Sequence, residues 1–158
     1  MINEVLEILP SALKIKLESF SNLKSIREIR IRVNRNVILM LNSSYSLNDE
    51  YEIEYTPTLK DILEILLRIS KNSIYAIQND INNGFVTIKG GHRIGICGEV
   101  VIEDGKVKNI KNINSLNIRV ANQVIGVADS LYKEVVCNGK VKNTLIVSPP
   151  RIWKNNNA

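Results

Sequence analysis

Apolar and charged side chains alternate along residues 26 to 33, and this period constrains the fold more than any other feature of the chain. One side of the segment carries Ile29, Ile31 and Val33, and the other carries Glu28, Arg30 and Arg32. Because successive side chains of a strand point to opposite faces, the alternation predicts a strand with one buried and one polar face. Residues 37–41 and 51–55 are predicted to be further strands.

Apolar residues recur at helical spacing on both sides of this strand region. Residues 3–9 and 11–20 are separated by Pro10, which predicts two short helices or one kinked helix. Thr58 and Asp61 have the spacing of a capping box and are predicted to open another helix. The apolar face predicted for this helix consists of Leu59, Ile62, Leu63, Leu66 and Ile69.

The second half of the domain is predicted to be mainly antiparallel strands. A helix opened by Ser73 is expected to stop at Asn82-Asn83-Gly84. Predicted strands follow at residues 85–89, 94–103, 107–110 and 117–120. Gly90-Gly91 and Asp104-Gly105 fit the tight turns between them, and residues 128–136 are predicted to form a helix. The fold class expected is therefore α+β, an N-terminal domain with helices and an antiparallel meander.

The run Thr144-Leu145-Ile146-Val147 is apolar after its first residue and leads into Ser148, Pro149 and Pro150. A continuous apolar run is typical of a strand that is buried on both faces of a parallel sheet. We expect it to be the first strand of a separate α/β domain that does not continue. The predicted organisation is an N-terminal domain over 1–142, this strand over 143–150, and an aberrant tail over 151–158.

The tail, Arg-Ile-Trp-Lys-Asn-Asn-Asn-Ala, lacks the glycines expected after such a strand. It can be written with the codons CGG ATA TGG AAA AAC AAC AAC GCN. Omitting the first base gives Gly-Tyr-Gly-Lys-Thr-Thr-Thr, which is the pattern of a phosphate-binding loop. The hypothesis is that a one-base shift of the reading frame destroyed a phosphate-binding loop here, and the alternative is an ordinary disordered terminus. An uninterrupted reading frame with different codons would exclude the frameshift.

Composition excludes several classes of protein. No run of about 18 apolar residues exists, so no membrane-spanning helix is predicted, and the acidic N-terminus is unlike a signal peptide. Cys97 and Cys137 lack metal-ligand spacing and are expected to be buried free thiols, and His92 cannot form a histidine metal site by itself. No metal site is therefore predicted. The net charge of +5 permits attraction to nucleic acid or anionic lipid but does not decide between them.

Three segments contain residues that could bind anions. The glycines of residues 90–98 could let the backbone approach a phosphate beside Arg93, or they could simply permit a bulge or close packing in a hairpin. Arg119 lies on the polar face of its strand, where a solvated arginine is the commoner outcome. Arg30 and Arg32 either bind an anionic partner, or are solvated or paired with Glu28.

These segments together resemble a known family. The order is Glu-Ile-Arg-Ile-Arg-Val-Asn-Arg, Gly-Phe-Val-Thr-Ile-Lys-Gly-Gly-His-Arg-Ile-Gly-Ile-Cys-Gly, Ser-Leu-Asn-Ile-Arg-Val-Ala and Ile-Val-Ser-Pro-Pro. In content and order they resemble stage III sporulation protein AA, over residues 1 to 150. That family belongs with the hexameric ATPases of type II and type IV secretion and pilus systems.

The resemblance implies an N-terminal domain followed by a RecA-like motor that uses ATP and Mg²⁺. It also implies a hexamer that energises a secretion-like membrane complex between mother cell and forespore, from the mother-cell cytoplasm. Arg93 and Arg119 lie in segments that resemble those contacting nucleotide in such ATPases, and Ser148, Pro149 and Pro150 would lead into the phosphate loop. In place of the phosphate-loop pattern the chain has Arg-Ile-Trp-Lys-Asn, so hydrolysis by this chain alone is not expected.

A small basic nucleic-acid-binding module is the alternative function, suggested by the pI of 9.2. Aromatic residues make up only 5% of the chain, and no base-stacking motif of the RNA-recognition type is present. Nucleic acid is therefore not expected to be the partner.

Overall fold

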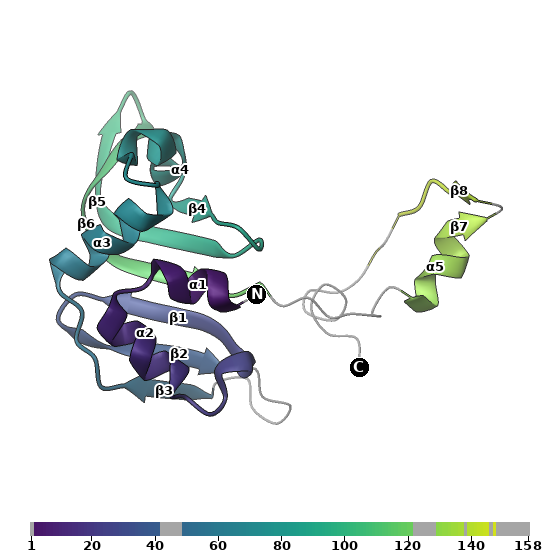
Figure 1. Cartoon of the computed structure of the whole chain (residues 1–158). Coiled ribbons are helices and arrows are strands. Elements are labelled where there is room, and N and C mark those ends of the chain that lie inside the picture. The colour runs from purple at the N-terminus through teal and green to yellow at the C-terminus, as the bar shows by residue number, and fades with distance from the viewer. Residues whose placement is uncertain (1, 42–48, 122–128, 138, 146, 148–158) are drawn as a thin grey trace. The chain divides into compact units, whose positions relative to one another are not determined.

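The computed structural model describes residues 2–41, 49–121, 129–137, 139–145 and 147. The chain forms two compact units, Met1–Ala121 and Asn122–Ala158, and each is described by itself (Figure 1). The α+β fold class is confirmed. The predicted boundary between residues 142 and 143 concerns the organisation of a longer protein, and it stays a prediction.

The first unit is built on a six-stranded sheet with the order β3-β2-β1-β6-β5-β4. Its strands are β1 (Ile26–Arg32), β2 (Arg35–Leu41), β3 (Glu50–Ile53), β4 (Phe85–Thr87), β5 (Arg93–Glu103) and β6 (Lys106–Arg119). Every neighbouring pair is antiparallel. The first strand predicted from the alternation, β1, lies at the centre, between β2 and β6, where one of its faces can be fully covered.

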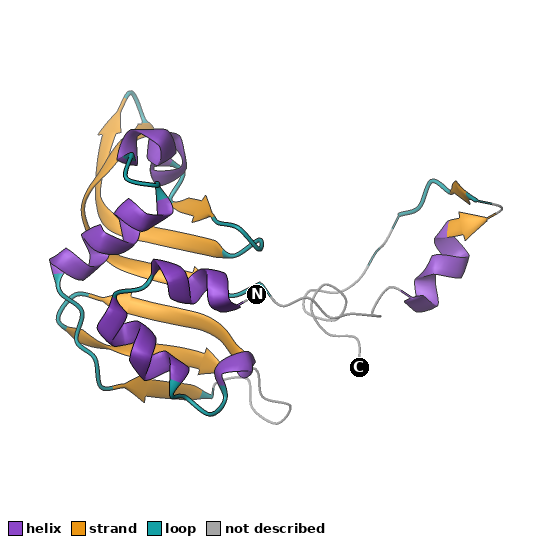
Figure 2. Cartoon of the chain, in the orientation of Figure 1, coloured by secondary structure: helices purple, strands orange, loops and turns teal. Residues whose placement is uncertain are grey.

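Helices cover one face of this sheet (Figure 2). They are α1 (Ile2–Ile8), α2 (Ser11–Glu18), the 3-10 turn η1 (Leu23–Ser25), α3 (Leu59–Ile69), the 3-10 turn η2 (Ile74–Ile77) and α4 (Gln78–Asn82). Pro10 separates α1 from α2, so the first of the two predicted alternatives, two short helices, is the one observed. No described helix covers the opposite face, which is called the open face below.

The core is a layer of aliphatic side chains between the helices and the sheet. Ile29 on β1 lies opposite Ile118 on β6, and Ile118 lies opposite Ile94 on β5. All three are fully buried, together with Leu13 and Leu17 from α2. This register places every second residue of three adjacent strands under the helices, and the residues between them on the open face.

The helix α3 begins as the sequence predicts, but its buried stripe is rotated from the predicted one. Thr58 and Asp61 form the capping box, in which the Asp61 carboxylate accepts a hydrogen bond from the Thr58 backbone N–H at 2.7 Å. Leu59 and Leu63, predicted to be buried, are 56% and 53% exposed, whereas Ile65 is fully buried. The apolar residues surround more than half of this helix, so periodicity alone could not select the side that meets the sheet.

One long strand replaces two predicted short ones. Residues 107–110 and 117–120 were expected as separate strands, but β6 is continuous from Lys106 to Arg119 and pairs with β5 for most of its length. A bulge interrupts the pairing at Gly98, where a Cβ atom would lie 2.5 Å from the backbone oxygen of Lys111. Only glycine fits there, so this glycine serves close packing in the hairpin.

The second unit contains α5 (Asp129–Val135) and a hairpin of β7 (Val136–Cys137) with β8 (Lys140–Val141). Of the strand predicted over 144–147, Thr144, Leu145 and Val147 have no regular secondary structure, and residue 146 lies outside the described residues. Leu145 is 86% exposed and Val147 is 84% exposed. A strand needs a neighbour to accept and donate its backbone hydrogen bonds, and no described strand pairs with this segment.

Candidate anion-binding site

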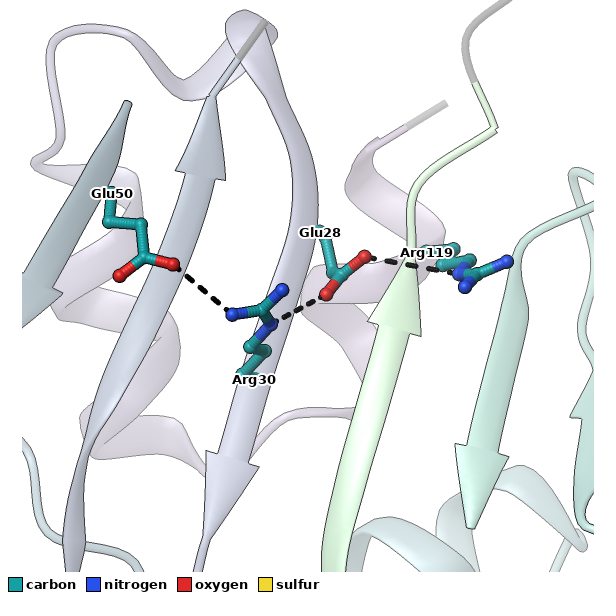
Figure 3. Close-up of polar contacts among 4 residues, drawn as sticks. All are labelled: Glu28, Arg30, Glu50 and Arg119. Carbon is teal, nitrogen blue, oxygen red and sulfur yellow. Dashed lines mark hydrogen bonds and ion pairs between the residues drawn. The ribbon is translucent and has the colours of Figure 1, made fainter. Parts of the chain in front are cut away.

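Charged side chains form a row across the open face. Strands β3, β5 and β6 each contribute one of them, and β1 contributes two from alternate positions. The row, called the arginine row, consists of Glu50 on β3, Arg30 and Glu28 on β1, Arg119 on β6 and Arg93 on β5. Figure 3 shows four of its members side by side on the sheet. Their positions follow from the register, since Glu28 pairs with Arg119 and Arg119 pairs with Arg93.

Arg30 contacts two carboxylates. Its Nε donates to Oε1 of Glu28 at 2.7 Å, and its Nη1 donates to Oε1 of Glu50 at 3.2 Å (Figure 3). The hydrogen bond to Glu28 is the main reason that the pKa of Arg30 is raised above its usual value. The predicted alternative of a pair between Arg30 and Glu28 is therefore the one observed, and the charge of Arg30 is balanced by two carboxylates.

Arg119 and Arg93 are differently placed. Nε of Arg119 is 3.9 Å from Oε2 of Glu28, and the Arg119 side chain is 67% exposed. Cζ of Arg93 lies 4.2 Å from the centroid of the Phe85 ring, which supports the guanidinium by a cation–π contact. Among the described residues no carboxylate pairs with Arg93. The two guanidinium groups are thus direct cross-strand neighbours, and the carboxylate of Glu28 lies 3.9 Å from Arg119 on the side away from Arg93.

The pairing of Arg93 with Arg119 favours the binding of an anion between them. Like charges directly opposite each other in a sheet destabilise the pairing, typically by about 0.2–1 kcal/mol. An anion bound by both groups removes that repulsion, and guanidinium presents a planar fork of donors that matches phosphate oxygens. The register therefore brings together the two arginines that the sequence singled out, Arg93 and Arg119.

The other predicted features have different roles or lie elsewhere. Arg32 is on the same face as Arg30 but pairs with Arg35 at the far end of β1. His92 is fully buried, and its Nδ1 accepts a hydrogen bond from the Ala121 backbone N–H at 3.0 Å. Of the two interpretations of the glycine-rich segment, close packing in a hairpin is thus the one supported. Ser148, Pro149, Pro150 and the tail 151–158 lie outside the described residues.

Both cysteines are exposed free thiols, so the prediction of buried ones is wrong. Cys97 follows the buried Ile96 along β5 and therefore points to the opposite side, while Cys137 ends the short strand β7. The described residues hold no group of three acidic, histidine or cysteine side chains that could bind a metal ion. Nor is any described helix both long and apolar enough to cross a membrane.

Two members of this face were not found from the sequence. Glu50 reaches Arg30 only because β3 and β1 flank β2, and no local pattern shows that order. Phe85 lies under Arg93 because β4 pairs with the start of β5. A lone aromatic residue at the start of a short strand gave no signal of that contact.

The fold and its charged open face define an α+β domain with a candidate anion site on the sheet. The family model described as "Sporulation stage III, protein AA" matches residues 2–157. The chain belongs to this family, as the resemblance in its sequence indicated. It is 37% identical over 155 residues to "Stage III sporulation protein AA" of Bacillus subtilis (strain 168).

That alignment covers 97% of this chain and 48% of the relative, so the chain spans about half the length of the protein it matches. Among solved structures, the chain is similar to the VirB11 ATPase from the Brucella suis type IV secretion system, crystallised in complex with sulphate. The identity is 16% and the TM-score is 0.41, with 92% of this chain and 40% of that chain covered.

Proposed function

We propose that this chain supplies the N-terminal domain of a sporulation ATPase, and that Arg93 and Arg119 contact the phosphate groups of ATP bound to the motor domain. The observation that supports the proposal is the direct pairing of these two arginines across β5 and β6. The ATPase activity itself rests on the resemblance of the family to secretion ATPases.

Each arginine has a distinct part in the proposal. Arg119 is 67% exposed and moves from its 3.9 Å contact with Glu28 to the phosphate oxygens. Arg93 is oriented by its stacking on Phe85, so it loses less side-chain freedom when an anion binds. Positive charge placed where charge develops on the transferring phosphoryl group stabilises the transition state.

Hydrolysis needs parts that the arginine row does not supply. A phosphate loop binds the β-phosphate with successive backbone amides, its lysine neutralises the phosphate oxygens, and its hydroxyl binds Mg²⁺. Here Lys154 is followed by Asn155, which has no hydroxyl. We therefore propose that ATP and Mg²⁺ are the ligands of the longer protein, and that this chain alone does not turn ATP over. A magnesium-dependent ATPase rate from the purified 158-residue chain would contradict this part of the proposal.

The partners follow from the same proposal. The longer protein is proposed to form a hexamer in the mother-cell cytoplasm and to act on membrane proteins of a secretion-like complex. Gel filtration with light scattering of the longer protein, with and without ATP, tests the hexamer. The alternative of a nucleic-acid-binding module has no specific support among the described residues.

The test uses the longer protein with Arg93→Gln and Arg119→Gln introduced separately. Both side chains lie on the open face rather than in the aliphatic core, so the variants are expected to fold. We expect the rate of ATP hydrolysis at saturation to fall at least tenfold in each, with the melting temperature within about 2 °C of the parent.

The control is Lys16→Gln with Lys60→Gln, which removes two exposed positive charges on α2 and α3, away from the arginine row. This double variant should keep the parent rate. If both arginine variants also hydrolyse ATP at the parent rate, Arg93 and Arg119 are not part of the nucleotide site.

A further inference from the structure

We propose that the open face carries a second anion site, separate from the arginine row, where β1 turns into β2. A hollow of about 450 Å³ lies at this turn. Its lining residues are Arg32, Val33, Asn34, Arg35, Asn114 and Ser115. The ligand class we infer is a small phosphate-bearing anion, such as a free phosphate or diphosphate or a phosphorylated headgroup.

The hollow has an uncompensated positive charge. Arg32 and Arg35 are direct cross-strand partners, and both are exposed. No carboxylate lines the hollow, and among the described residues neither arginine forms an ion pair. Arg30, which lies two residues before Arg32 on the same face, forms ion pairs with two carboxylates instead. The repulsion between Arg32 and Arg35 is therefore left for a ligand to relieve.

The backbone around the two arginines is held in place. The Val33 backbone N–H donates to the Asn114 backbone carbonyl at 3.0 Å, and the Asn34 backbone N–H donates to the Pro57 backbone carbonyl at 3.0 Å. Asn34 itself adopts a left-handed conformation, with φ of 61°, which asparagine tolerates better than most residues. The turn is thus tied to β6 and to the loop before α3. A fixed turn lowers the entropy lost when the arginines close on a ligand.

Neutral donors complete the site. Ser115 is the cross-strand partner of Arg32, and Asn114 precedes it on β6. Among the described residues, the Ser115 hydroxyl and the Asn34 and Asn114 amides have no hydrogen-bond partner for their side chains. Two guanidinium forks, two amides and one hydroxyl offer more donors than a carboxylate can use, whereas a phosphate group has at least three acceptor oxygens.

The site is distinct from the pair formed by Arg93 and Arg119. Ser115 and Arg119 are four residues apart on β6, which corresponds to about 13 Å along a strand. One phosphate group cannot touch both pairs. The two proposals can therefore fail independently, because each has its own pair of arginines.

The experiment is a titration of the 158-residue chain with inorganic pyrophosphate at 150 mM salt, followed by NMR. We expect saturable shifts in the Nε–Hε signals of Arg32 and Arg35 and in the Asn114 side-chain amide. Arg32→Gln with Arg35→Gln should weaken binding at this site at least tenfold. Arg35→Lys, which keeps the charge but not the fork, should weaken it less.

Two matched variants make the result specific. Lys16→Gln with Lys60→Gln removes the same charge elsewhere, and Arg93→Gln with Arg119→Gln disables the other pair; both should leave these shifts unchanged. The proposal is overturned if the shifts do not saturate. It is equally overturned if the lysine control weakens binding as much as loss of Arg32 and Arg35, since the effect would then be one of net charge.

A second arm identifies the source of the phosphate. Vesicles of phosphatidylcholine with 30% phosphatidylglycerol are mixed with the chain and floated, and pure phosphatidylcholine vesicles serve as the reference. Flotation that depends on Arg32 and Arg35 assigns the site to a lipid headgroup. Saturable pyrophosphate binding without flotation assigns it to a free phosphate compound. Absence of both refutes the site.

Discussion

Glu28 connects the two halves of the arginine row, and replacing it with glutamine should change stability and anion binding in opposite directions. Its Oε1 accepts from Arg30 at 2.7 Å, and its Oε2 lies 3.9 Å from Nε of Arg119. The Glu28 side chain is only 17% exposed. Glutamine keeps the size and one acceptor oxygen but removes the charge that both guanidinium groups share.

The expected loss of stability follows from these two contacts. Unit charges 3.9 Å apart attract by about 1 kcal/mol in water-like surroundings, and exposed pairs retain about 0.2–1 kcal/mol of this after side-chain ordering. The contact with Arg30 is shorter and less exposed, and exchanging its charged acceptor for a neutral one costs about another 1 kcal/mol. We expect Glu28→Gln to lower the unfolding free energy by about 1–2 kcal/mol, or the melting temperature by about 4–8 °C.

Anion binding should increase in the same variant, if the proposed function is correct. The carboxylate repels an anion bound at Arg93 and Arg119, and at a separation of about 7 Å its removal is worth about 0.6 kcal/mol, or roughly threefold in affinity. The assays are thermal unfolding followed by circular dichroism and a pyrophosphate titration, each at low and high salt. Both differences should shrink at high salt because the charges are near the surface.

The control for this variant is Glu54→Gln, an exposed carboxylate that follows β3 and forms no ion pair with the described residues. It should change neither stability nor affinity measurably. The reasoning is refuted if Glu28→Gln melts with the parent, since the contacts would then contribute nothing. Weaker pyrophosphate binding in a folded Glu28→Gln variant would show that the carboxylate supports the anion site instead of opposing it.

Four further predictions concern the fold. Ile118→Ala, in the fully buried centre of β6, should cost about 2–5 kcal/mol in urea unfolding, and a loss below 1 kcal/mol would contradict the core assignment. Thr58→Ala should cost about 1 kcal/mol through the lost cap. Burial opposes the charged form of Asp61, but hydrogen bonds from Thr58 outweigh it and lower the pKa of Asp61. The stability from Asp61 is therefore present above its unfolded pKa and is lost as pH falls through the folded one, so the urea midpoints of parent and Asp61→Asn should converge below about pH 4. Gly90→Ala should destabilise the protein more than Gly105→Ala. A Cβ atom at Gly90 would lie 2.7 Å from Nε2 of the buried His92, whereas a Cβ atom at Gly105 would have no atom within 4 Å. Equal melting temperatures of the two variants would refute this.

Local signals predicted most elements of the first unit correctly. The alternation of 26–33 became β1, the capping box opens α3, and Asp104-Gly105 turns β5 into β6 with both residues at positive φ. These features depend on neighbours within four residues, so the sequence contains all the information they need. The predictions failed where a distant neighbour decides, as for the buried side of α3 and for the single long strand β6 in place of two short ones.

The candidate site divides in the same way. The sequence showed that Arg93 and Arg119 lie on polar strand positions, and the resemblance to the family suggested their role. It did not show that they are cross-strand neighbours, that Glu28 lies beside Arg119, or that Arg32 opposes Arg35. Those pairings depend on which strands are adjacent and in which register.

The sequence by itself thus determined most of the strands and helices of the first unit, which strand positions are polar, and to which family the chain belongs. Only the tertiary structure decided the strand order β3-β2-β1-β6-β5-β4, and with it the row of charges on the open face. The physical reason is that periodicity sets which way a side chain points, whereas the partner it meets depends on backbone hydrogen bonds between strands as far apart in sequence as β1 and β6.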